Sequence, residues 1–280
     1  MSRWIATVVV AGALAVGSAV ECAQRSSPSP SPQTSSRIEP TAREAAAAAG
    51  YDGGFRFCRI RFRTSPLGDG NGWYVDYPRA DENLSVRVSE LTNIPVTTVG
   101  EGTPVHIVIG LTDPELFQCP FVMMTEPGGA EFDAREAAQL RLYLLKGGFL
   151  WADDFWGSRA WEWWSHQIAK ALPPSEYPIV EVPIDHPMYH TLFNVGGLPQ
   201  IPNIGLWVRS HITSERGADS AQAHGRAIFD QKGHAIVFMT FNTDFGDAFE
   251  QESVSPDYFE RFSVPAYEIG ADVIIYALTH

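Results

Sequence analysis

The segment EFDAREAAQLRLYLLKGGFLWADD (131–154) carries the strongest fold signal in the chain. Asp133 and Glu136 have the three-residue spacing of a capping box, which predicts that a helix begins there. The apolar positions that follow at helical spacing are Ala137, Leu140, Leu144 and Leu145. Gly147 is a natural stop for that helix, and FLWA (149–152) is typical of a buried strand. The segment therefore indicates the helix-to-strand half of a βαβ unit.

The flanking segments extend this pattern in both directions. Strands are expected at FRFCRIRF (55–62), VHIVIGL (105–111), FVMMT (121–125), IVEVPI (179–184) and LWVRSH (206–211). Helices are expected at 80–91 with Asp81 as its cap, at 158–172 and within 256–279. AIFDQKGHAIVFMTFN (227–242) predicts a hairpin that turns at 231–233. The fold class predicted is α/β, a three-layer sandwich with a mainly parallel central sheet and a late antiparallel hairpin.

The amino-terminal segment resembles a secretory signal peptide. A positive start at 1–3 precedes an uncharged apolar stretch at 4–20, and small residues follow, so we expect a signal peptide over 1–23. The apolar run is shorter than the roughly 20 residues that span a bilayer, so no membrane span is expected after cleavage. Glu21 precedes Cys22, where a lipidation signal prefers a small residue, so lipidation is not expected. The expected location is periplasmic or secreted.

The rest of the chain divides by composition. The Ser/Pro/Ala-rich stretch 24–50 is expected to be a disordered linker, and 51–280 is expected to form a single α/β domain. The formal net charge is −13, from 20 basic and 33 acidic residues. A surface with this charge repels phosphate backbones and anionic lipids, which argues against nucleic-acid binding. The remaining partner classes are a small molecule or a cell-envelope protein.

Two cysteines remain in the expected mature domain, Cys58 and Cys119. Export to an oxidising compartment permits a disulfide between them. Two buried free thiols are an equally good interpretation, because Cys58 lies in a strand-like run.

Three patches carry candidate binding residues. Asp153 and Asp154 follow the predicted strand 149–152, and ligands of parallel sheets bind beyond the carboxyl ends of strands. Both side chains can share one site only if the strand breaks there. The alternative is that one of them caps the helix that begins near Ser158.

The second patch, GWYVDYPRADEN (72–83), offers Trp73, Asp76 and Tyr77, which either line the same site or simply pack. The third, PIDHPMYH (183–190), offers Asp185 and His186, a pair that suits acid/base or metal chemistry. Its alternative is an ordinary loop. The candidate metal ligands are Asp76, Asp153, Asp154 and His186.

No standard nucleophile or cofactor motif is present. The sequence lacks G-x-S-x-G, H-E-x-x-H, C-x-x-C, a Walker loop and G-x-G-x-x-G. GDGNG (68–72) leads into WYVDYP rather than into a helix, so it is not a dinucleotide fingerprint. We therefore expect no organic cofactor, with a divalent metal left open.

Six stretches together resemble a bacterial family, domain-of-unknown-function family 4159. They are GWYVDYPRADENL, CPFVMMTEPGG, LRLYLLKGGFLWADD, DHPMYH and the terminal FGDAF and GADVIIYALTH. The resemblance implies a class I glutamine amidotransferase-like, flavodoxin-like fold. It implies a site lined by Asp76, Glu126, Asp153, Asp154 and His186. The turn EPGGAEF (126–132) has neither Cys nor Ser at its apex, so amidotransferase activity is not expected.

Three functional hypotheses follow. The first is an exported domain that binds a sugar or polyol, or an envelope partner, without covalent catalysis. The second is a divalent-metal hydrolase built on Asp76, Asp153 or Asp154, and His186. The third is a docking adaptor, for which an exposed Trp163 in WEWWSHQ (161–167) would be evidence. An enzyme is the less favoured class.

Overall fold

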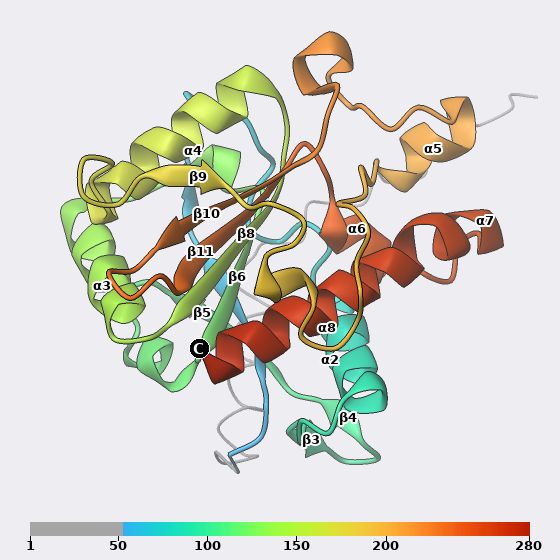
Figure 1. The fold of residues 1–280 in the computed structure, drawn as a ribbon, viewed down its shortest axis with the longest axis horizontal. Helices are drawn as coiled ribbons and strands as arrows, with labels where there is room; N and C mark the ends of the chain where they lie inside the picture. The colour runs from blue at the N-terminus through green and yellow to red at the C-terminus, as the bar shows by residue number, and fades with distance from the viewer. Residues whose placement is uncertain (1–52) are drawn as a thin grey trace, which may run out of the picture. The chain divides into compact units, whose positions relative to one another are not determined.

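The computed structural model describes residues 53–280, and a seven-stranded sheet runs through their centre (Figure 1). In spatial order the strands are β5 (His106–Gly110), β1 (Phe57–Arg61), β6 (Phe121–Thr125), β8 (Phe149–Phe155), β11 (Ala235–Phe241), β10 (His224–Phe229) and β9 (Ile179–Glu181). The first five are parallel, whereas β10 runs antiparallel to both β11 and β9. Counted along the chain, the parallel strands lie in the order 2-1-3-4-5, that of a doubly wound sheet. The predicted parallel sheet and late hairpin are confirmed.

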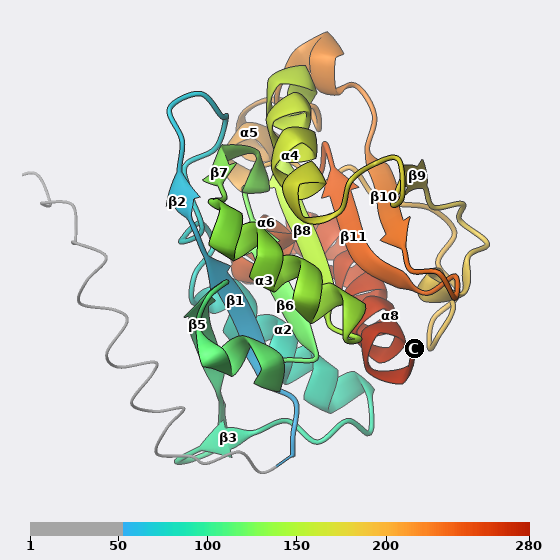
Figure 2. The same cartoon turned by 90° about the vertical axis from the view of Figure 1, so that its left-hand side faces the viewer.

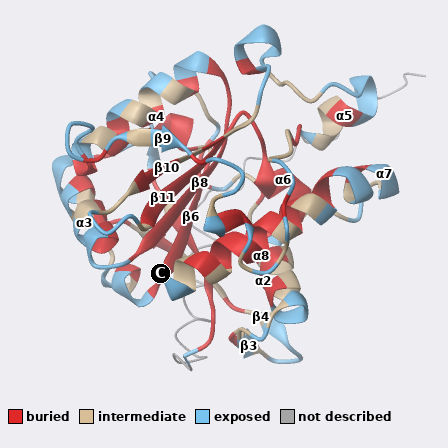
Figure 3. Ribbon diagram, in the orientation of Figure 1, coloured by how far each residue is buried: buried red, intermediate tan, exposed pale blue. Residues whose placement is uncertain are grey.

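Helices cover both faces of this sheet. One face is covered by α3 (Ala134–Leu145) and α4 (Gly157–Ala171), the other by α2 (Arg79–Leu91), α6 (Phe245–Glu250) and α8 (Val264–Thr279) (Figure 2). Met124 packs in the first core and its neighbour Met123 in the second, as expected for a strand whose side chains alternate. Buried residues follow the sheet and the inner sides of the helices (Figure 3). The predicted three-layer sandwich is confirmed.

Short elements connect these layers. The two-stranded pairs are β2 (Arg63–Thr64) with β7 (Ala130–Glu131), and β3 (Thr98–Val99) with β4 (Thr103–Pro104). The short helices are η2 (Pro114–Gln118), η3 (Pro127–Gly129), η4 (Pro187–Tyr189), α5 (Ile204–Ser210), η5 (Gly217–Ser220), α7 (Pro256–Tyr258) and η6 (Phe259–Ser263). No helix within 53–280 combines the length and apolarity that a bilayer span requires. The expected signal peptide (1–23) and linker (24–50) lie outside the described residues.

The predicted start and end of α3 are confirmed. Asp133 Oδ1 accepts hydrogen bonds from the N–H of Arg135 at 2.8 Å and of Glu136 at 2.9 Å, and the Glu136 carboxylate accepts one from Asp133 N. Gly147 follows with φ +95°, a conformation that favours glycine. Both signals are local, which explains why the sequence carries them.

Two local predictions are wrong. LWVRSH (206–211) forms the end of helix α5, not a strand, because Asn203 Oδ1 caps that helix through Gly205 N at 2.9 Å. Only Trp207 of α5 is buried, so the apolar run marks no buried strand. Asp81 does not cap α2, since the N-cap is Pro78 and makes no side-chain bond. Asp81 instead lies fully buried one turn into the helix.

Cys58 and Cys119 are joined by a disulfide. Cys58 lies in β1 and Cys119 directly before β6, and these two strands are neighbours in the sheet. The interpretation with two free thiols is therefore wrong. The link fastens the amino ends of the central strands, at the edge opposite to the loops that follow them.

Candidate metal centre

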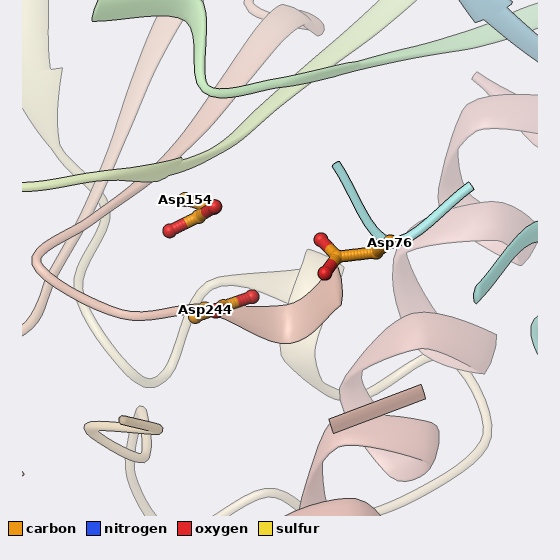
Figure 4. A group of neighbouring side chains, drawn as sticks. All are labelled: Asp76, Asp154 and Asp244. Carbon is orange, nitrogen blue, oxygen red and sulfur yellow. The ribbon is translucent and has the colours of Figure 1, made fainter. Parts of the chain in front are cut away.

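Three aspartates from distant parts of the chain meet at the carboxyl edge of the parallel strands. Asp76 belongs to the segment between β2 and α2, Asp154 to the end of β8, and Asp244 to the turn between β11 and α6. One carboxylate oxygen of each lies within 4.8 Å of the others. Figure 4 shows the Asp76 and Asp244 carboxylates turned toward each other, with Asp154 beside them. All three are buried, at 4–7% exposure.

A second trio shares one member with the first. Asp76, Asp247 and Glu250 also have carboxylate oxygens within 4.8 Å of one another. Asp247 and Glu250 both lie on the short helix α6, which Asp244 caps by accepting from Asp247 N at 2.7 Å. Asp76 is therefore the carboxylate common to both groups.

A break in β8 lets consecutive aspartates serve the same edge. Asp153 pairs with Thr240 and Phe155 with Phe241, so Asp154 between them has no partner and forms a bulge. Asp154 has φ +59°, outside the extended region. Its side chain enters the acidic cluster, while Asp153 accepts hydrogen bonds from Thr240 Oγ1 and from Gly246 N at 3.0 Å. The break that a shared site requires is present.

Neither aspartate caps α4. The N–H of Ser158 donates to Asp219 Oδ2 at 2.9 Å, and Gly157 N donates to Asn242 Oδ1 at 2.9 Å. The capping alternative is therefore wrong. Asp219 comes from the short helix η5, far along the chain, which leaves Asp154 available to the cluster.

Strained backbone is concentrated at this edge. Five residues other than glycine have positive φ within the described part of the chain, and four of them lie at this edge: Asp76, Glu126, Asp154 and Asn242. Such conformations cost on the order of 1–3 kcal/mol each and are found preferentially at functional sites. The concentration singles out this edge from the rest of the fold.

The Asp76 carboxylate lacks a compensating group. Its Oδ2 is buried and accepts no hydrogen bond from any described residue. No basic side chain of residues 53–280 lies within ion-pair distance of Asp76, Asp154 or Asp244. The Asp247 carboxyl lies near enough to share a proton with Asp76. An unpaired buried carboxylate is costly, so a proton or a cation must compensate it.

The nearest buried cation is already paired. Arg59 is fully buried and its guanidinium binds the Asp81 carboxylate, with Nε–Oδ1 at 2.9 Å. Its Nη1 donates to the carbonyls of Trp73 at 3.2 Å and Val75 at 3.1 Å. Arg59 therefore fixes the turn that presents Asp76, and its charge offsets only part of the rise in the pKa of Asp76 that burial and Asp247 cause.

Burial and mutual repulsion disfavour ionisation of the carboxyl groups in the cluster. Burial is the main cause that raises the pKa of Asp153 to about 7 and that of Asp247 to about 6. Burial, with neighbouring carboxylates in second place, raises the pKa of Asp76, Asp154 and Asp244 well above the usual range. A divalent cation would reverse this by supplying positive charge. Carboxylate oxygens alone suit hard cations such as Mg²⁺, Ca²⁺ and Mn²⁺.

Glu126 lies at the same edge, but its carboxylate binds the glycine-rich loop and is not part of either trio. Its carboxylate accepts hydrogen bonds from the backbone N–H and the side chain of Asn71, the latter at 2.8 Å, and from Gly72 N at 3.0 Å. Glu126 N donates to Asp153 O at 3.0 Å. Burial raises the pKa of Glu126 to about 7. The glycine-rich loop is therefore anchored beside the cluster.

Other predicted site residues lie apart from the cluster. Trp73 is buried and packs edge-on against Tyr77, whose hydroxyl is 3.1 Å from His106 Nε2, so both fit the packing interpretation. His186 contacts the ring of Phe229, which pairs with the first residue of β11 at the amino edge of the sheet. Asp185 next to it is exposed. The structure brings Asp76, Asp153 and Asp154 together, without Asp185 and His186.

Trp163 is half-buried, and its Nε1 donates to Ala130 O at 2.6 Å. The exposed tryptophan that would favour a docking adaptor is not found at this position.

The sequence did not identify Asp244, Asp247 and Glu250 as site residues. The sequence feature that could have revealed them is TDFGDAFE (243–250), an acidic stretch directly after the carboxyl end of the hairpin strand β11.

Fold and site together define a doubly wound α/β domain with a buried carboxylate cluster at the carboxyl edge of its parallel strands. The chain belongs to the family described as Domain of unknown function (DUF4159), which it matches over residues 56–278. A search of curated proteins found no match.

Proposed function

We propose that this chain is an exported domain that binds a divalent cation between Asp76, Asp154 and Asp244, and that the cation is the attachment point for a small ligand. The observation that carries the proposal is the Asp76 Oδ2 atom, buried without a hydrogen-bond donor inside a group of carboxylates. The Cys58–Cys119 disulfide supports the exported location, since disulfides persist in oxidising compartments.

The charge of the site favours a neutral, hydroxyl-rich ligand. Three carboxylates with one divalent cation keep a formal charge of −1, and the chain as a whole carries −13. A phosphate or carboxylate ligand would be repelled by this field, whereas the hydroxyls of a sugar or polyol can complete the coordination of the ion. This supports the sugar or polyol class over anionic ligands.

The test is calorimetric titration of Mg²⁺, Ca²⁺ and Mn²⁺ into the purified chain, with Zn²⁺ for comparison. We expect binding of at least one of the first three ions and its loss in Asp154→Asn, which keeps an acceptor for the 2.9 Å bond from Trp156 Nε1. Asp185→Asn is the matched control, since Asp185 is an exposed acid at the opposite edge. Equal affinities in the wild type and Asp154→Asn would refute the proposal.

A metal-dependent hydrolase is the second candidate, favoured by the position of Glu126. Its backbone N–H donates to Asp153 O, and its carboxylate is close enough to Asp154 to raise the pKa of that carboxyl, after burial. A bound divalent cation would supply an activated water, and Glu126 is the residue proposed as the general base. Hydrolysis of a panel of esters and glycosides with the preferred ion would test this. Loss of turnover in Glu126→Gln with unchanged ion affinity would favour the hydrolase, and absence of turnover in the wild type would leave the binding function.

A further inference from the structure

The two carboxylate trios share Asp76, and this arrangement suits a pair of ions better than one. The first trio adds Asp154 and Asp244, and the second adds Asp247 and Glu250. The two trios therefore flank a single carboxylate that has two oxygens. Paired divalent cations in proteins lie about 3.5–4 Å apart, a separation that one bridging carboxylate spans.

The carboxylates of Asp247 and Glu250 keep lone pairs that can bind an ion, in spite of the hydrogen bonds that they accept. Asp247 Oδ2 accepts from Ile204 N at 2.7 Å, and Glu250 accepts from the side-chain amide of Gln251. A carboxylate has about four lone-pair positions, so each of these groups keeps sites for an ion. No basic side chain of the described residues is within ion-pair distance of Asp247 or Glu250.

Space for the Asp76 carboxylate is provided by a glycine in α6. A Cβ on Gly246 would lie 2.1 Å from Asp76 Oδ2, so any other residue at this position would displace the Asp76 carboxylate. The same Oδ2 accepts no hydrogen bond from the described residues, and Asp76 is 7% exposed. A buried oxygen with no donor, on the carboxylate that both trios share, is the second observation that points to bound cations.

The formal charge of the five carboxylates favours two bound cations over one. The five carboxylates carry −5, so one divalent cation leaves −3 and two leave −1. Uncompensated negative charge in a buried site is strongly unfavourable. We propose that the cluster binds two divalent cations, with Asp76 bridging an ion at Asp154 and Asp244 to an ion at Asp247 and Glu250. This inference rests on the proposed cation-binding function.

The experiment counts ions per chain and measures their coupling. Calorimetry with Mn²⁺, and electron paramagnetic resonance of the loaded protein, should show two ions with a spin-coupled signal. Glu250→Gln should lower the count from two to one and replace the coupled signal by that of an isolated ion, while Asp76→Asn should abolish both. Asp185→Asn should retain two.

The outcomes separate the two proposals. One ion in the wild type, with unchanged affinity in Glu250→Gln, would overturn the paired centre and leave the single site. No ion in the wild type would overturn both. Circular dichroism of each variant controls for folding, and Asp247→Asn, which keeps an acceptor for Ile204 N, provides a second variant of the same trio.

Discussion

Asp76 and Gly246 are in contact across the carboxyl edge of the sheet: a Cβ added to Gly246 would lie 2.1 Å from Asp76 Oδ2. The two residues belong to the turn before α2 and to the first turn of α6. The backbone N–H of Gly246 at the same time donates to Asp153 Oδ2 at 3.0 Å. Gly246 therefore leaves room for the Asp76 carboxylate and holds the Asp153 carboxylate through its N–H, without contributing a charged group.

Gly246→Ala tests this contact without removing any carboxylate. The added methyl group displaces Asp76, so we expect cation affinity to fall by at least about tenfold, which corresponds to roughly 1.4 kcal/mol. Calorimetry with the preferred ion measures the change. Gly197→Ala is the control, because Gly197 has no atom within 4 Å of its added Cβ. An unchanged affinity in Gly246→Ala would show that Asp76 is not a ligand.

The stability of the ion-free protein should fall as the pH rises from about 4 to 7. An unfolded Asp ionises near pH 4, whereas burial raises the pKa of Asp153 to about 7 and of Asp247 to about 6 in the folded protein. Within this window the unfolded state binds fewer protons than the folded state, so the free energy of unfolding decreases with pH. For Asp153 and Asp247, the folded and unfolded states are both protonated below this window and both ionised above it.

Added cation should restore stability at the upper end of this window. An ion at 100 times its dissociation constant adds about 2.7 kcal/mol to the free energy of unfolding. Chemical denaturation between pH 4 and 8, with and without Ca²⁺ or Mn²⁺, measures both effects. A stability that rises with pH in the ion-free protein would contradict the assignment of buried, protonated carboxyls.

Arg59→Met should destabilise the fold by about 3–5 kcal/mol, because it leaves the buried Asp81 carboxylate unpaired. The double variant Arg59→Met, Asp81→Leu should recover part of this loss, since no buried charge remains. It should still bind cation more weakly than the wild type, because the carbonyls of Trp73 and Val75 lose the donor that fixes the turn before Asp76. Urea denaturation and ion titration separate the two effects, and full affinity in the double variant would exclude the positioning role.

Reduction of the Cys58–Cys119 disulfide should lower the free energy of unfolding by about 2–4 kcal/mol, since the bond closes a loop with a sequence separation of 61. Cation affinity below the unfolding transition should not change, because the bond fastens the amino ends of β1 and β6 and the carboxylates lie at their carboxyl ends. Denaturation with and without reductant, and ion titration of the Cys58→Ala, Cys119→Ala variant, measure the two quantities. A loss of ion binding on reduction would show that the two edges are coupled.

Local signals in the sequence were sufficient for much of the fold. The capping box at Asp133 and the glycine stop at Gly147 act within one helical turn, so the helix and the strand after it could be predicted. The same local logic failed at 206–211, where apolar alternation suggested a strand and a cap at Asn203 starts a helix. Asp81 looked like a cap because the sequence does not show that Arg59 lies opposite it.

The sequence by itself determined the α/β class, the hairpin and the presence of Asp153 and Asp154 at a strand end, because these depend on periodicity and on residues close together in the chain. Only the tertiary structure decided which acids meet. Asp154 turns into the cluster through a bulge that depends on pairing with β11, and Asp244 reaches Asp76 only because parallel strands bring their carboxyl ends to one edge. Convergence of this kind is set by strand order and register, which are long-range properties that no local pattern encodes.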